Sequence, residues 1–232
     1  MEKLIYPLWS HPGETSSALR ERLLGVSKAL LEAGAHHVRV SVVDDAVASA
    51  APLRQTNSKP AWDALLSLWV DTAVWRDRFE SLFAPHVARY HGYLVCESEP
   101  IRHAARAKGD GSRVEGMCQV VFLQRPPRLS AEEWLRVWQG SHTQVAIDTQ
   151  STFGYRQNVV IRTLTYAAPH YDAIVEENFP AAAMTDANAF YDAVGDDAKR
   201  DANLKAMIDS CVRFIDFDRI DVTPTSEYNL SR

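Results

Sequence analysis

The stretch "YDAIVEE" at residues 171–177 decides the fold, because the chain contains a near-copy of it. Residues 62–68 have the sequence "WDALLSL". Both stretches begin with an aromatic residue, Asp and Ala, and both continue with apolar residues that are typical of a β-strand. The repeat predicts that one structural unit occurs twice. It also favours a shared structural role for Asp63 and Asp172 at a strand end.

The segments around residues 62–68 predict the order strand, helix, strand, strand, helix, strand. The first helix, 16–34, stops at Gly34 and has one apolar face, made of Leu19, Leu23, Val26, Leu30 and Leu31. The second helix, 73–87, carries aromatic residues at four-residue spacing, namely Trp75, Phe79 and Phe83. Strands are expected at 3–9, 37–43, 62–70 and 89–101.

The same order recurs in the second half of the chain. Ser130 and Glu133 form a predicted capping box at the start of a helix over 130–146. The helical region 184–214 contains Gly195, where we expect a break. Strands are expected at 116–126, 154–166, 171–179 and 215–228.

This repeated order predicts an α+β fold. A ferredoxin-like βαββαβ unit forms a four-stranded antiparallel sheet with both helices on one face. The bare faces of two such sheets can be buried against each other. We therefore predict two tandem ferredoxin-like units whose sheets pack as an intramolecular α+β barrel. The halves are expected at 1–101 and 117–232, joined by a basic, glycine-containing linker at 102–116.

Composition limits the classes of function. The chain has 232 residues, 46% of them hydrophobic, and a net charge of −5. This charge and the lack of a basic stripe argue against a nucleic-acid partner. No apolar run is long enough to cross a membrane, and we expect no signal peptide. The three cysteines are far apart without a CxxC motif, so buried, reduced thiols and a cytoplasmic location are predicted.

The helix over 130–146 contains an unusual centre, "WQGSH" at 138–142, where three mediocre helix formers follow one another. Its spacing places four residues on one face, which must meet the sheet: Trp134, Trp138, His142 and Val145. A buried imidazole there is either a core histidine bonded to a carbonyl or a general acid/base whose intrinsic pKa lies near neutrality. Gly140 and Ser141 would give a ligand room to approach.

The strand after this helix supplies further candidates. Tyr155 and Gln157 share one strand face and Asn158 points to the other. Directed into an apolar interior, these side chains can hold a carbonyl or hydroxyl group, and directed outward they face solvent. Asp172 and Glu176 also share a strand face. Each can either orient His142 or form an ordinary salt bridge.

The remaining candidates lie outside this strand. His11 follows the first strand in a Pro-Gly turn, either at the mouth of the barrel or in solvent. We predict no metal site, because no histidines have ligand spacing and His36 and His37 are adjacent. Nucleotide, zinc and serine-nucleophile motifs are missing from the sequence. Four tryptophans are expected in the core, where they can also wall a cavity for a flat apolar ligand: Trp62, Trp69, Trp134 and Trp138.

The second half resembles the EthD family of the dimeric α+β barrel superfamily. The matching stretches are "LSAEEWLRVWQGSHTQVA", "GYRQNVVIR" and "YDAIVEENF". The sequence departs from the family where Thr143-Gln144 follows His142 in place of Ala-Pro. It departs again where the third strand ends in Glu177-Asn178-Phe179 instead of Leu-Trp-Phe. These departures concern the substrate more than the fold.

The resemblance implies an enzyme or binding protein for a hydrophobic, oxygenated small molecule. We expect a cofactor-free lyase, cyclase, dehydratase or isomerase in which His142 moves a proton and Tyr155 or Asn158 polarises a carbonyl. The ligand is expected inside the barrel, near Trp138, Ser141, Gln157, Asp172, Glu176 and His11. Two alternatives stay open, a non-catalytic carrier or sensor and a haem-binding member of the superfamily. A homodimer is compatible with both.

Overall fold

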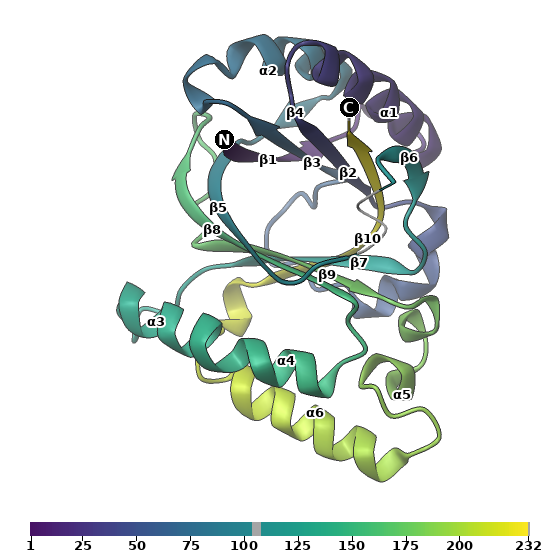
Figure 1. The fold of residues 1–232 in the computed structure, drawn as a ribbon, viewed down its shortest axis with the longest axis vertical. Coiled ribbons are helices and arrows are strands. Elements are labelled where there is room, and N and C mark those ends of the chain that lie inside the picture. The colour runs from purple at the N-terminus through teal and green to yellow at the C-terminus, as the bar shows by residue number, and fades with distance from the viewer. Residues whose placement is uncertain (104–107, 232) are drawn as a thin grey trace.

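The strands of both halves join in one closed barrel (Figure 1). The computed structural model describes residues 1–103 and 108–231. In this part of the chain eight strands close antiparallel in the order β2-β3-β1-β5-β8-β9-β7-β10, and β10 pairs back with β2. Their bounds are Glu2–Trp9 (β1), His37–Val42 (β2), Ala64–Val70 (β3), Tyr93–Ile101 (β5), Met117–Leu123 (β7), Gly154–Thr163 (β8), Ala173–Phe179 (β9) and Asp221–Ser231 (β10). The predicted α+β barrel is confirmed.

The helices cover the outer faces of the barrel. Figure 1 shows α1 and α2 outside the strands of the first half, and α3, α4 and α6 outside those of the second. The α-helices span Ser16–Glu32 (α1), Asp77–Phe83 (α2), Ala131–Val137 (α3), Thr143–Thr149 (α4), Ala187–Phe190 (α5) and Asp197–Cys211 (α6). Short 3-10 turns lie at Asp45–Leu53 (η1), Ala73–Trp75 (η2), Ala84–His86 (η3), Ala181–Met184 (η6) and Phe217–Arg219 (η7), and a two-residue strand, β4, at Arg89–Tyr90.

Both halves show the same order of elements and the same order of strands. The first half pairs its strands as β2-β3-β1-β5 and the second as β8-β9-β7-β10. Asp63 accepts a hydrogen bond from the backbone N–H of Ser10 at 2.8 Å, and Asp172 accepts one from that of Arg125 at 2.7 Å. Each aspartate therefore ties the start of a third strand to the end of a first strand.

Local sequence signals fix the ends of the second-half helices. The capping box is confirmed, because Ser130 and Glu133 exchange hydrogen bonds at the start of α3. Gly195 has a φ of +78° and lies between α5 and α6, as the expected break requires. All four tryptophans predicted to be in the core are buried.

Two expectations about the first half are wrong, and the linker contains an element that the sequence did not predict. Trp75 is 67% exposed, because it lies in the 3-10 turn η2 and not in the helix that carries Phe79 and Phe83. Cys96, which lies on β5, is exposed and not buried as predicted. The predicted linker contains a strand, β6 at Asp110–Arg113, which pairs with β10, while its residues 104–107 lie outside the described residues.

The barrel interior is divided into an apolar and a charged zone. The apolar zone contains Ile5, Leu65, Tyr93, Val120, Phe122 and Ile174. The charged zone contains, among the described residues, three cations and three carboxylates: Lys3, Arg39, Arg156, Glu97, Glu176 and Glu227. Among these six described groups the positive and negative charges are equal in number.

Glu176 is the centre of this cluster. Its carboxylate receives the ammonium of Lys3 at 2.9 Å and the guanidinium of Arg39 at 2.9 Å, and Arg156 lies 3.7 Å away. Burial alone would raise the pKa of Glu176, but the charges of Arg39, Lys3 and Arg156 outweigh it and hold the pKa well below its usual range. Because Lys3 and Arg39 belong to the first half, the cluster fastens the two halves together.

We expect Glu176→Gln to destabilise the fold by about 3 kcal/mol or more, because it leaves the buried cations Lys3, Arg39 and Arg156 around a neutral amide. Urea unfolding at neutral pH measures the loss. Asp209→Asn is the control, since the Lys205–Asp209 ion pair is exposed and its removal should leave the unfolding midpoint nearly unchanged. A loss below about 1 kcal/mol for Glu176→Gln would contradict the role of the cluster.

Candidate functional site

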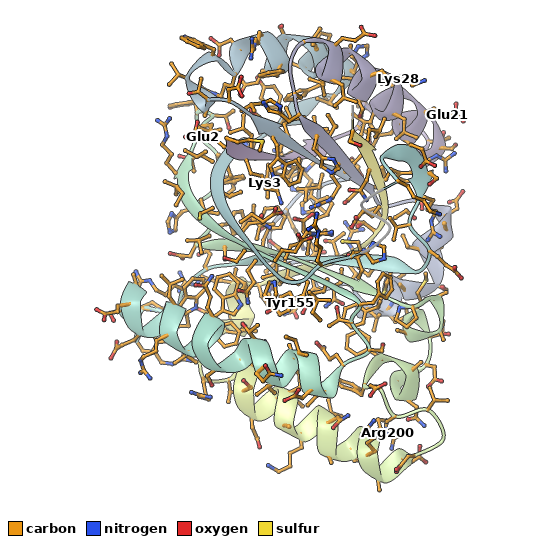
Figure 2. All side chains as sticks on the ribbon, in the orientation of Figure 1. Glu2, Lys3, Glu21, Lys28, Tyr155 and Arg200 are labelled. Atoms are coloured by element: carbon orange, nitrogen blue, oxygen red, sulfur yellow. The ribbon has the colours of Figure 1, made fainter. Side chains whose placement is uncertain are left out.

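A pocket lies between the helices of the second half and the outer face of their sheet. Its volume is about 230 Å³. Apolar side chains make most of its wall, among them Val121, Val175, Trp138, Met207 and Phe214. Its polar members include His142, Tyr155 and Glu177. Figure 2 labels Tyr155 on the helix side of the sheet and Lys3 on the barrel side.

The unusual helix centre forms a π turn, Trp138–His142, between α3 and α4. The backbone N–H of Thr143 bonds to the carbonyl of Trp138, five residues earlier. This wider turn advances the buried face by one residue, so Ala146 is buried and not Val145. Gly140 faces solvent, which corrects the expectation that it borders the pocket.

The Tyr155 hydroxyl is held by a neighbouring amide. It accepts a hydrogen bond from Nε2 of Gln157 at 3.0 Å. Gln157 is itself held by Oγ1 of Thr143 at 2.7 Å. Burial raises the pKa of Tyr155, so the phenol keeps its proton. Since the hydroxyl oxygen accepts from Gln157, its proton can be donated to a ligand.

Glu177 is the carboxyl group of the pocket, and the sequence did not single it out. It lies beside Tyr155 on the neighbouring strand and is 8% exposed. Within residues 1–103 and 108–231 no hydrogen bond or ion pair reaches its carboxylate. Burial raises the pKa of Glu177 to about 7. A carboxyl group with this pKa can take up and release a proton at neutral pH.

His142 is buried against the helices. Its Nδ1 lies 2.9 Å from Oγ of Ser210, and its ring contacts that of Phe214 with 4.6 Å between centroids. Burial, helped by the charge of Arg213, lowers the pKa of His142 to about 4. The imidazole is therefore neutral at pH 7, which corrects the expectation of a near-neutral pKa.

The structure separates the other predicted site residues. Asn158 and Glu176 point into the barrel, where both side chains bind Lys3, Asn158 at 2.7 Å. Neither can therefore contact the same ligand as Tyr155. Ser141 lies outside the pocket and accepts a hydrogen bond from Arg213. Asp172 lies at its strand end. His11 is exposed beyond the end of β1.

The location of His142 itself needs correction. We expected it to face a hollow between the two halves, but it packs in a cluster with the helices and the outer sheet face of the second half. The cause is strand alternation: Tyr155 and Val175 point outward, whereas Arg156 and Glu176 point into the barrel. The sheet thus lies between His142 and the charged zone.

The first half serves as an internal control for these side chains. Val38 and Leu68 are cross-strand partners there, as Tyr155 and Glu177 are in the second half. Val40 occupies the place that matches Gln157. All three first-half residues belong to the apolar core beneath α1 and α2. The fold therefore accepts apolar residues at these places, and the polar ones in the second half are not required by it.

Among the described residues, no three His, Cys, Asp or Glu side chains gather in a way that could hold a metal ion. No helix among them is long and apolar enough to cross a membrane.

Comparison with known proteins identifies the segment that contains the pocket's helices. Residues 126–218 match the EthD domain. The resemblance to the EthD family, based on the motifs of the second half, is thereby confirmed for this segment. No curated protein sequence matches the chain.

Three solved structures resemble the whole chain. An anthrone oxidase-like protein has a TM-score of 0.56 at 10% identity and covers 99% of this chain and 92% of its own. A protein described as a monooxygenase from Lactobacillus acidophilus NCFM has 0.51 at 9% identity, over 99% and 95%. Another from Fusobacterium nucleatum subsp. nucleatum has 0.51 at 6% identity, over 99% and 92%. At such identities the likeness shows the fold alone.

Glu177→Gln should change how stability depends on pH. A carboxyl group whose pKa is higher in the folded state binds more protons there, so wild-type stability falls as pH rises from 4.5 to about 7. The variant lacks this loss of stability. We expect the difference in unfolding free energy, variant minus wild type, to be about 3 kcal/mol larger at pH 8 than at pH 4.5, as measured by urea unfolding. A difference independent of pH would show that Glu177 has an ordinary pKa.

Proposed function

We propose that the protein is an enzyme that moves a proton next to the carbonyl group of a small, apolar, oxygenated molecule. The observation that carries this proposal is the placement of Glu177 beside Tyr155 in an apolar pocket. The pKa of Glu177 is about 7, and the Tyr155 hydroxyl accepts a hydrogen bond from Gln157. The apolar matching residues of the first half support a functional reason for these groups.

The proposed step uses the two groups together. The Glu177 carboxylate takes the proton from the carbon next to the carbonyl, and the electron pair of that C–H bond forms an enolate. The Tyr155 hydroxyl donates a hydrogen bond to the enolate oxygen and stabilises its charge. The neutral His142 binds a polar group of the ligand. Return of the proton to a different carbon of the ligand gives isomerisation. Loss of a hydroxyl group from the adjacent carbon, which leaves with the proton as water, gives dehydration.

A second outcome for the enolate is oxidation. The names of the structural neighbours, anthrone oxidase-like and monooxygenase, support this candidate. In it the enolate carbon gives its electron pair to dioxygen and forms a C–O bond, and the resulting hydroperoxide takes up a proton and loses water to leave a second carbonyl group. The initial proton transfer is the same in both cases. Consumption of dioxygen therefore distinguishes an oxidase from a lyase, cyclase or isomerase.

The residues of the pocket do not fit haem. A pocket of about 230 Å³ is smaller than the ~300–1,000 Å³ typical of drug-sized ligands, and a porphyrin is larger than most of these. We derive no step through haem. A ligand of one or two rings suits the volume, since a cavity of ~150 Å³ already binds benzene.

We also propose that the two halves are ferredoxin-like copies of one ancestral unit. Their shared strand order and the equivalent bonds of Asp63 and Asp172 support this origin. The second copy then gained its polar pocket, while the first kept an apolar core. A duplicated barrel of this kind does not need a second chain to cover its inner sheet faces.

Hydrogen–deuterium exchange at the carbon next to the carbonyl of 2-tetralone tests the proposed reaction. NMR in D₂O should show exchange faster with the protein than in buffer. Glu177→Gln should slow the catalysed exchange by about 10²-fold or more, because it removes the base. Tyr155→Phe should slow it by about 10²-fold. His142→Ala should raise KM more than it lowers kcat.

A binding measurement gives the matched control. Glu177→Leu carries the residue of the matching first-half position, so it should fold, bind 2-tetralone and lack catalysed exchange. Wild-type binding without exchange would indicate a carrier or sensor and refute the enzyme. Equal exchange rates for wild type and Glu177→Gln would remove Glu177 from the mechanism.

A further inference from the structure

A second cavity lies at one mouth of the barrel. It has a volume of about 210 Å³ and is found where β1 and β7 end and where β5 and β10 begin. Phe122 of β7 lines it, whereas the neighbouring Val121 and Leu123 line the helix-side pocket. The sheet therefore separates the two cavities.

Aromatic rings form the walls of this mouth cavity. Tyr93, Phe122 and Tyr171 are buried and contact one another, with ring centroids 4.9 Å apart for Phe122–Tyr171 and 6.0 Å for Tyr93–Tyr171. Trp62 and Trp9 add two larger rings. Flat walls of this kind suit an aromatic ring. The volume exceeds that of cavities known to hold benzene, at ~150 Å³, and leaves room for substituents.

The inner end of the cavity presents hydrogen-bond acceptors. The buried Asp221 accepts hydrogen bonds from the backbone N–H groups of Asn57 and Ser58, at 2.7 and 2.9 Å. The hydroxyls of Ser58 and Tyr171 also donate hydrogen bonds to the Asp221 carboxylate and contact each other, which makes one Ser58–Tyr171 cluster. Their oxygen lone pairs remain for a ligand. A ligand group at this end must therefore donate a hydrogen bond, as a phenolic hydroxyl does.

The outer rim is positively charged. Arg89 and Lys59 line it and are exposed, and the Arg89 guanidinium lies over the Trp9 ring at 3.7 Å. Neither cation has an ion pair within the described residues. The guanidinium is positioned by its contact with the Trp9 ring, and its N–H groups can bind a carboxylate.

From these features we infer that the mouth cavity is a second binding site, distinct from the proposed catalytic pocket, for a small phenolic carboxylate. Its ring lies among Trp62, Phe122 and Tyr171. Its hydroxyl donates to the Ser58–Tyr171 cluster, and its carboxylate faces Arg89. The site is independent of the chemistry at Glu177.

Titration with 4-hydroxybenzoate tests the site, and binding is monitored by calorimetry and by the fluorescence of the tryptophans at the cavity. Saturable binding is expected. Arg89→Gln should weaken it about tenfold, since a charged hydrogen bond contributes ~1.5–3 kcal/mol. Tyr171→Phe should reduce the preference for 4-hydroxybenzoate over benzoate. Arg89 is exposed, so its replacement should leave the fold intact.

Tyr155→Phe is the matched control, because it alters the other cavity and should leave the affinity for 4-hydroxybenzoate unchanged. Three results would overturn the inference. These are no saturable binding, binding that Arg89→Gln does not weaken, and binding that Tyr155→Phe weakens instead. The last result would move the ligand to the helix-side pocket, and it is distinguishable from loss of exchange with 2-tetralone.

Discussion

The cluster of buried ion pairs is the interaction that gives the inner side chains of the two halves fixed partners. Apolar contacts across the interior do not demand one particular partner, whereas ion pairs do. Glu176 takes Lys3 and Arg39 from the first half and Arg156 from its own sheet. Arg39 also lies 3.6 Å from Glu227 on β10. These pairs cross the barrel interior, while the backbone ladders β5–β8 and β10–β2 give the register between the halves.

The same strands serve two environments because their side chains alternate. On β9, Glu176 points into the barrel and is held ionised by cations, whereas the adjacent Glu177 points to the helices and meets none. Burial lowers the pKa of neither group by itself; the difference comes from the neighbouring charges. One residue of displacement thus separates a structural carboxylate from one suited to proton transfer.

Periodicity was sufficient for the fold and insufficient for the site. Apolar spacing and the repeated Asp stretch predicted the strands and the barrel, because the core needs those residues. The periodicity also indicated that four side chains lie close together near one pocket: Trp138, His142, Tyr155 and Gln157. It failed at Glu177, since only the pairing of β9 with β8 and β7 shows what lies beside it. The π turn was not predicted, because the prediction used the regular spacing of an α-helix, and this spacing is interrupted around Gly140 and Ser141.

The seams between the halves have a consequence for the connectivity of the chain. Ladders of backbone hydrogen bonds join β5 to β8 and β10 to β2, on opposite sides of the barrel. Strand pairing therefore holds the halves together on both sides, in addition to the peptide between β5 and β7. We expect that two separate polypeptides, cut in that peptide, reassemble into the same barrel, and that a gene encoding the halves in reverse order specifies the same architecture.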